Sequence, residues 1–335
     1  MVQNDIFRAQ LSDRLERAGA GRSQLVLIHC PTFDFNAIDI SVIKNHGYYS
    51  YPPYGLMCLA AAVADLGMSP LIIDLNFLLL EQLNEVNAVT KEQALQAMLE
   101  ILAEKLAGVD PQVVGVSAGV TVSNVFTVQA HPFIEVLKFV RKKKSSVVIA
   151  GGVIANDEAG GLLKAGLVDF VFKGEGERKI RHIGTRMTKG SVSDDVNEIT
   201  AGIVFLHDSK VMETEGDCRD VQFTWDMRKT YETIALEKYN IVGSLSPFSR
   251  MAGVDKKYAT VQLNRGCRGQ CTFCGVKPFI GNGIRQTSAE LVIQELDYLV
   301  NERKVSHIEW LDDDLLAKKE SAHRILEHMK RYGEG

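Results

Sequence analysis

The sequence lacks any long uninterrupted apolar run and any recognisable secretion signal. Its longest apolar stretches, residues 55–66 and 71–80, are too short to span a bilayer or are interrupted by Asp65, Asp74 and Asn76. The N-terminus does not show the basic segment followed by an apolar one that a signal peptide requires. We therefore expect a cytoplasmic protein without a membrane span.

The chain also lacks a strong charge of either sign. Its 335 residues include 38 Lys and Arg against 42 Asp and Glu, a formal net charge of −4. Such a balance gives no broad attraction for nucleic acid or for an anionic membrane. The basic run at residues 141–144 suits the last turn of a helix, where cations interact favourably with the helix dipole; a phosphate-binding patch is the alternative. No nucleic-acid partner is predicted.

Nucleotide-binding glycine loops, internal repeats and low-complexity tracts are missing as well. The first half instead alternates short aliphatic runs with helical patterns. The predicted strands cover residues 25–28, 71–74, 113–117, 146–150 and 168–172, and the predicted helices cover 53–66, 91–106, 131–143 and 157–165. Repeated β–α–β units predict an α/β fold with a doubly wound, Rossmann-like parallel sheet.

A sheet of this kind binds ligands beyond the C-terminal ends of its strands. The residues predicted at those ends are Cys30, Asp74, Ser117, Gly151, Gly152 and 173–177. The glycine pair would let a flat or bulky ligand approach the backbone closely. A tight turn after the strand explains the same pair equally well, so this motif leaves two interpretations open.

Cysteine is scarce, but three of the six cysteines are clustered. Cys30, Cys58 and Cys218 are scattered and are interpreted as small buried residues. A Cys-x3-Cys-x2-Cys motif follows the predicted strand over residues 258–263; its members are Cys267, Cys271 and Cys274. In a reducing compartment clustered cysteines bind metal more often than they form disulfides.

Three thiolates on one loop can hold a cubane iron–sulfur cluster and leave one iron open to an exogenous ligand. Structural zinc is the alternative, but zinc prefers four protein ligands. No further cysteine follows the motif, and the nearest downstream histidine, His307, starts another predicted strand. The spacing therefore favours an iron–sulfur cluster.

Two further β–α units are predicted after the motif. Residues 287–290 form a capping box before a helix over 289–300, a strand covers 306–311, and a final helix covers 320–332. The second strand ends in Asp312, Asp313 and Asp314. Three adjacent carboxylates suit either a bound cation or an exposed turn at a helix N-terminus, and both interpretations stand.

The cysteine motif, with Phe273 immediately before its third cysteine, resembles the radical S-adenosylmethionine superfamily. By that resemblance Cys267, Cys271 and Cys274 hold a [4Fe–4S] cluster whose fourth iron is chelated by S-adenosylmethionine. Phe273 would pack against the adenine, and Asp312 and Asp313 would meet the ammonium group. A one-electron reductant of the flavodoxin or ferredoxin type would drive cleavage of the sulfonium to a 5′-deoxyadenosyl radical.

Residues 23–180 resemble the cobalamin-binding domain that precedes many radical S-adenosylmethionine enzymes. The motifs that carry the resemblance are Tyr51-Pro52-Pro53-Tyr54-Gly55-Leu56, Ile73-Asp74, Val114-Gly115-Val116-Ser117, Gly151-Gly152 and Gly174-Glu175-Gly176-Glu177. The resemblance implies that the cobalamin tail passes Ser117, Gly151 and Gly152. Residues 74–79 lack the histidine and glycine of the Asp-x-His-x-x-Gly loop that ligates cobalt, so no histidine ligand is expected, although cobalamin is not excluded.

The predicted organisation has four parts: an N-terminal extension (1–22), a cobalamin-binding-like domain (23–182), a connecting region (183–257) and the start of a partial (β/α) radical barrel (258–335). Two β–α units cannot close a barrel, so we expect a truncated product, a fragment or a chain completed by a partner.

The leading hypothesis is a cobalamin-dependent radical enzyme that methylates an unreactive carbon of a small-molecule or peptide substrate. The alternatives are a cyclase or rearrangement enzyme that does not use cobalamin, and a catalytically incomplete cofactor-binding fragment.

Overall fold

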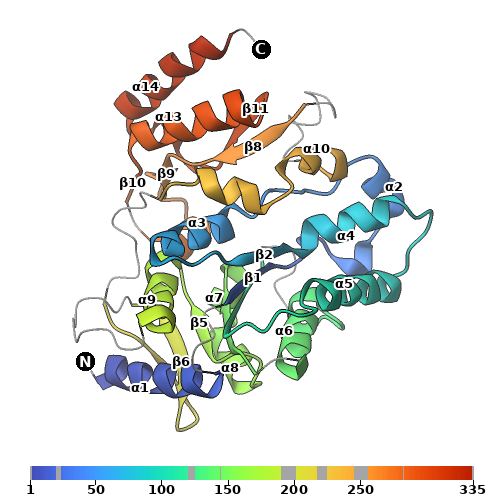
Figure 1. The fold of residues 1–335 in the computed structure, drawn as a ribbon, viewed down its shortest axis with the longest axis vertical. Coiled ribbons are helices and arrows are strands. Elements are labelled where there is room, and N and C mark those ends of the chain that lie inside the picture. Colours follow the sequence, from blue (N-terminus) through green and yellow to red (C-terminus); the bar gives the residue numbers. More distant parts are fainter. Residues whose placement is uncertain are drawn as a thin grey trace.

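A seven-stranded sheet organises the first two thirds of the chain (Figure 1). The computed structural model describes residues 2–19, 24–119, 125–143, 145–189, 201–216, 225–244, 256–281 and 283–333. The strands are β1 (Leu25–His29), β2 (Leu71–Asp74), β3 (Val113–Ser117), β4 (Val147–Gly151), β5 (Phe170–Phe172), β6 (Ile203–His207) and β7 (Lys210–Glu213). They lie in the order β2-β1-β3-β4-β5-β6-β7. The first five are parallel, whereas β6 and β7 add an antiparallel hairpin.

Helices cover both faces of this sheet, because alternate side chains of each strand point to opposite sides. Leu25 and Leu27 pack with one set of helices, α1 (Val2–Arg17), α3 (Tyr54–Val63) and α9 (Glu177–Lys189). Val26 and Ile28 pack with the other set, α2 (Ile40–Lys44), α4 (Leu75–Asn84), α5 (Lys91–Lys105), α6 (Pro132–Lys143), α7 (Val153–Asp157) and α8 (Ala159–Lys164). This arrangement confirms the predicted α/β fold class. None of the helices in the described ranges is both long and apolar enough to cross a membrane.

Four of these helices, α1, α2, α4 and α9, were not anticipated from the sequence. Helix α1 lies in the predicted N-terminal extension, and it buries Phe7 and Leu11 against the sheet. Helix α4 starts directly after β2 because the Asp74 carboxylate accepts a hydrogen bond from the backbone N–H of Phe77 (3.1 Å). Helix α9 follows β5. The single helix predicted over 157–165 is instead two short helices, α7 and α8, separated at Glu158.

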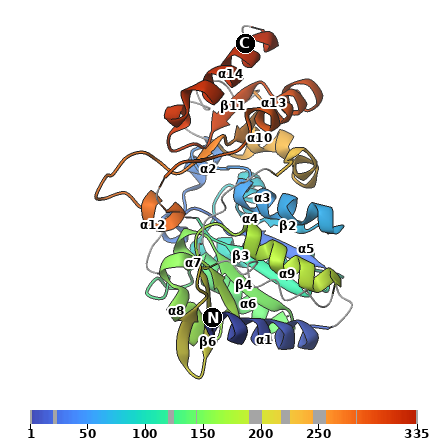
Figure 2. The ribbon, with the colours of Figure 1, turned by 90° about the vertical axis from the view of Figure 1, so that its left-hand side faces the viewer.

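The last part of the chain forms a second, smaller unit beside the sheet (Figure 2). Its parallel strands are β8 (Tyr258–Val261) and β11 (His307–Trp310), and its antiparallel pair is β9 (Asn264–Arg265) and β10 (Arg285–Gln286). Its helices are α12 (Val276–Ile280), α13 (Ala289–Asp297) and α14 (Lys319–Met329). Helix α13 is capped by Ser288, not by Thr287 as the predicted capping box required, because the N–H of Thr287 bonds the carbonyl of Leu263 (3.1 Å).

Residues between the two units pack on both of them. Tyr231 donates its hydroxyl hydrogen bond to the carbonyl of Thr260 in β8 (2.9 Å). Tyr239, in α10 (Tyr239–Val242), donates to the Asp74 carboxylate at the end of β2 (2.7 Å). The apolar cluster that contains Leu27 of the large sheet also contains Val261 and Leu296 of the smaller unit. The two units therefore share a continuous core.

Candidate cofactor site

The cysteine motif lies on a loop that leaves β8 and passes through β9. Its three thiols are free; that of Cys271 is exposed, and those of Cys267 and Cys274 are half-buried. A methyl group placed on Gly269 would lie 3.3 Å from Sγ of Cys267 and 3.7 Å from Sγ of Cys271, so both sulfurs border the same residue. The backbone N–H of Gly269 donates to Sγ of Cys267 (3.2 Å), and that of Cys274 donates to the carbonyl of Cys271 (3.3 Å). Backbone groups of the loop therefore contact other residues of the same motif, including the thiol of Cys267.

The remaining described cysteines are chemically different. Cys30 and Cys58 are buried in the two apolar clusters around the large sheet, and burial raises the pKa of each thiol. They are small core residues, as the sequence predicted, whereas Cys218 lies outside the described residues. Within the described ranges, no three His, Cys, Asp or Glu side chains lie close enough to share a single metal ion. A cubane binds each thiolate through a different iron, so its cysteines stand farther apart than the ligands of one ion.

Two of the three aspartates after β11 hold the cysteine loop in place. Asp312 accepts hydrogen bonds from the backbone N–H groups of Leu263 (3.0 Å) and Asn264 (2.5 Å), and burial raises the pKa of its carboxyl. Asp314 forms a bidentate ion pair with Arg268, with Nε–Oδ2 at 2.6 Å and Nη2–Oδ1 at 2.9 Å. The sequence left open whether a cation pairs with this acidic run. In the structure that cation is the guanidinium of Arg268, which belongs to the cysteine loop. Asp313 is exposed beside them.

Phe273 is the most exposed large apolar side chain among the described residues, with 91% of its surface accessible. A phenyl ring gains free energy when it leaves water, so a ligand that stacked on it would be stabilised. Phe273 adjoins Cys274, the last residue of the motif. Its predicted contact with adenine, and the predicted contact of Asp312 and Asp313 with the ammonium group of S-adenosylmethionine, stay predictions.

A cavity of about 300 Å³ opens at the C-terminal ends of β3, β4 and β5. It brings together Ser117, Gly151 and Gly152, the three residues that sequence reasoning placed at a cobalamin site. Further glycines line it because the backbone itself forms the wall; these are Gly55, Gly115, Gly174 and Gly176. The opposite wall includes Gln262 and Arg265, which lead into the cysteine motif, and Leu311, which precedes Asp312. One cavity therefore contacts both units.

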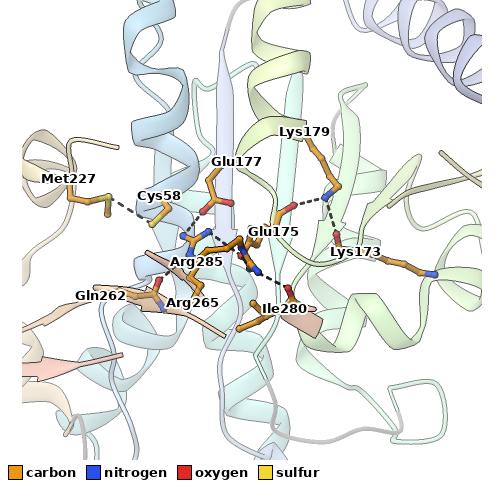
Figure 3. A network of polar contacts seen from close by, with 10 residues as sticks. All are labelled: Cys58, Lys173, Glu175, Glu177, Lys179, Met227, Gln262, Arg265, Ile280 and Arg285. Atoms are coloured by element: carbon orange, nitrogen blue, oxygen red, sulfur yellow. Dashed lines mark hydrogen bonds and ion pairs between the residues drawn. The ribbon is translucent and has the colours of Figure 1, made fainter. Parts of the chain in front are cut away.

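A buried ion-pair network joins the two units at this cavity, and Figure 3 shows its members. Arg265 of β9 pairs with Glu177 (2.6 Å) and lies 3.8 Å from Glu175, and Arg285 of β10 also pairs with Glu175. Burial lowers the pKa of Arg265, but the Glu177 carboxylate raises it, and the net effect is a raised pKa. The guanidinium therefore stays charged inside the protein.

The turn that supplies both carboxylates is braced by a buried lysine. Lys179 is 1% exposed, and its Nζ donates to the carbonyls of Lys173 (3.0 Å) and Glu175 (2.5 Å) (Figure 3). The sequence marked residues 173–177 only as the end of a strand. Arg265 and Arg285 were missed, because nothing in a lone arginine indicates which distant carboxylate it meets.

No family model matches this chain. Two curated relatives are each 23% identical to it. One is an uncharacterized methyltransferase of Pyrococcus horikoshii, matched over 69% of this chain and 46% of that protein. The other is the anaerobic magnesium-protoporphyrin IX monomethyl ester cyclase of a Synechocystis species, matched over 68% of this chain and 38% of that protein.

Solved structures of TsrM, a radical S-adenosylmethionine methyltransferase from Kitasatospora setae, share the fold. One contains cobalamin and a [4Fe–4S] cluster; it has a TM-score of 0.58 at 18% identity and covers 92% of this chain and 52% of that one. The other contains tryptophan and the S-adenosylmethionine analogue aza-SAM, with the same TM-score and identity, and covers 92% and 51% of the two chains. This chain therefore shares the fold of about half of TsrM.

The fold likeness confirms the resemblance found in the sequence, to radical S-adenosylmethionine proteins with a cobalamin-binding domain. It also confirms the predicted fold class. The relatives include a methyltransferase and a cyclase, both enzymes. The chain spans about half the length of the solved neighbours and less than half that of the curated relatives it matches.

Proposed function

We propose that this chain binds a [4Fe–4S] cluster, S-adenosylmethionine and cobalamin, and that it serves in a radical methylation of an unreactive carbon. Residues 23–182 form the cobalamin-binding part in this proposal, and residues 258–335 form the cluster-binding start of a radical barrel. Residues 1–22 and 183–257 act as an extension and a connection. The free thiols suit a reducing compartment such as the cytoplasm.

The observation that carries the proposal is the shared cavity. Ser117 and Gly152 on one wall come from the domain predicted to bind cobalamin, and Arg265 on the other wall is two residues from Cys267. Residues that flank the cysteine motif and residues predicted at the cobalamin site thus line one cavity. A reaction that passes a group between two cofactors needs this proximity, because orientation within one cavity lowers the entropic part of the barrier.

Each part of the chain has a distinct task. Cys267, Cys271 and Cys274 bind the cluster, while Asp312 and Asp314 fix the loop that carries them. Phe273, Asp312 and Asp313 contact S-adenosylmethionine. Ser117, Gly151 and Gly152 admit the cobalamin tail. When bound, the cluster and S-adenosylmethionine supply reductive radical chemistry, with electrons from a flavodoxin- or ferredoxin-type donor, and cobalamin supplies the methyl group.

The test is anaerobic reconstitution with iron, sulfide and hydroxocobalamin. We expect cubane absorption and bound corrinoid in the wild-type chain, and release of 5′-deoxyadenosine or transfer of a labelled methyl group after reduction. The triple variant C267A/C271A/C274A should lose the cluster and keep the corrinoid. Cys30→Ala, which removes a buried core thiol, is the matched control and should retain the cluster. A triple variant that kept its iron would overturn the proposal.

The cyclase relative supports a second candidate reaction, radical cyclisation or rearrangement. In this alternative the front domain does not use cobalamin. The same reconstitution separates the two. A chain that forms the cluster and cleaves S-adenosylmethionine, but takes up no corrinoid, would support cyclisation and exclude the methylation proposal. A chain that binds both cofactors without any cleavage would instead act as a cofactor-binding fragment.

A further inference from the structure

A second cavity of about 230 Å³ adjoins the first one at the end of β1. Strand β1 lies between β2 and β3, so the connections that follow β1 and β3 diverge here, as at the ligand crevice of other doubly wound sheets. The cavity is lined by His29, Thr32, Asn76 and residues 51–56, and it shares Ser117 and Gly152 with the first cavity. The two cavities therefore form adjoining lobes of one site.

The ring of His29 is oriented by the carboxylate of Asp74. Its Nδ1 lies 3.0 Å from Oδ1 of Asp74. The same carboxylate accepts hydrogen bonds from the hydroxyl of Tyr239 (2.7 Å, to Oδ2) and from the backbone N–H of Phe77 (3.1 Å, to Oδ1). Asp74 therefore acts as an acceptor toward all three partners. It follows that Nδ1 of His29 donates to Asp74 and that Nε2 is the ring nitrogen left for a ligand.

Nε2 of His29 is open to a ligand. Nε2 of His29 makes no hydrogen bond in the part of the chain that the structure describes, and the side chain, 14% exposed, borders the cavity. The neighbouring Asn76 is already engaged: its Oδ1 accepts from the backbone N–H of Thr32 (2.8 Å), and its amide nitrogen donates to the carbonyl of Tyr49 (3.1 Å). His29 thus presents an unused nitrogen base to the second lobe.

We propose that Nε2 of His29 ligates the metal centre of the molecule that occupies this site, the cobalt of a corrinoid. An imidazole whose other ring nitrogen donates to a carboxylate is the usual arrangement of a metal-ligating histidine, because the carboxylate fixes the ring and raises its basicity. Residues 74–79 contain no histidine, so the sequence predicted no such ligand. The structure supplies the histidine from the adjacent strand β1, and Asp74 orients it.

This inference rests on the proposed cobalamin binding, and its test uses a readout other than activity. The full chain is loaded anaerobically with cob(II)alamin, and its electron paramagnetic resonance spectrum is recorded with unlabelled and with ¹⁵N-histidine-labelled protein. We expect each cobalt line to be split by one nitrogen, as a triplet in unlabelled protein and as a doublet in labelled protein. The label distinguishes a protein histidine from the base of the cofactor's own nucleotide tail.

Two variants complete the test. His29→Gln should bind the corrinoid and lose the isotope-dependent splitting, whereas His323→Gln, an exposed residue of α14, should keep it. If cobalamin binds but the nitrogen splitting of the cobalt lines is the same in labelled and unlabelled protein, the ligation by His29 is wrong and the proposed function still stands. Absence of any bound corrinoid in the wild-type chain would overturn both.

Discussion

At the scale of single residues, the cavity between the two units depends on backbone geometry that only glycine adopts easily. Gly152 has a φ of +89°, and a methyl group added there would lie 2.6 Å from the carbonyl oxygen of Ala118 and 3.0 Å from Oγ of Ser117. Both the torsion and the contact oppose any side chain. The glycine therefore permits the close approach of β3 and β4 at the rim of the cavity.

Substitution of this residue should cost stability as well as cofactor binding. We expect Gly152→Ala to lower the free energy of unfolding by about 1–3 kcal/mol, because the added methyl group strains the backbone. Gly55→Ala is the matched control: nothing lies within 4 Å of its added methyl group, and alanine favours the helix by about 0.5–1 kcal/mol. Urea unfolding of both variants checks this, and equal stabilities would contradict it.

The sequence identified Gly151-Gly152 but left a tight turn and a ligand approach as alternatives. In the structure Gly152 has a positive φ and also lines the cavity, so the two interpretations are compatible with each other. His29 shows the opposite case. No local motif marked it, and its importance follows from a hydrogen bond to Asp74, which is 45 positions away in the sequence.

At the scale of elements, helix α13 buries an acidic side chain in the core between the two units. Glu295 is 6% exposed, and its Oε1 lies 2.6 Å from the hydroxyl oxygen of Tyr231. Burial raises the pKa of Glu295 to about 8, because the charged form loses its hydration. The side chain is therefore a neutral carboxylic acid at neutral pH and fits an apolar helix face.

This burial predicts a specific pH dependence of stability. The folded protein keeps the Glu295 proton up to about pH 8, whereas the unfolded chain releases it near pH 4.5. Stability from this group is complete below the lower value and is lost as pH rises toward the upper one, by a few kcal/mol in total, about 1.4 for each pH unit. Wild-type protein should lose stability relative to Glu295→Gln across this window in urea unfolding. Parallel pH profiles would contradict the prediction.

Strong local patterns predicted most elements, and the omissions have physical causes. The strands of the large parallel sheet were found because each is a short aliphatic run between helical patterns. Helix α4 was missed because its apolar residues continue those of β2 without a break, and only the Asp74 cap separates them. Helix α9 carries a narrow apolar stripe among charged residues, and tertiary packing against α3 stabilises it.

At the scale of the whole molecule, the cluster loop and the cobalamin-like domain are joined by buried charges. Arg265 and Glu177 are 8% and 4% exposed, and they come from β9 and the start of α9. A buried pair of this kind adds little net stability, but loss of one partner leaves an uncompensated charge in a low-dielectric interior. We infer that the pair fixes the position of one cofactor site relative to the other.

Removal of one carboxylate should therefore disturb both sites together. We expect Glu177→Gln to lower the free energy of unfolding by about 3 kcal/mol and to reduce cluster and corrinoid loading in the same sample. Glu213→Gln breaks the more exposed ion pair with Lys173 (2.7 Å) and should cost less than about 1 kcal/mol. Urea unfolding and cofactor content report the two effects. Loss of one cofactor alone would contradict the coupling.

The sequence by itself determined the fold class, the cysteine motif and several of the strand ends that line the cavity, because these depend on local periodicity and on close spacing along the chain. The tertiary structure decided which distant residues meet. It paired Asp314 with Arg268, Arg265 with Glu177, and His29 with Asp74. Such pairs depend on how strands are ordered in a sheet and how two units pack, and no local pattern records that information.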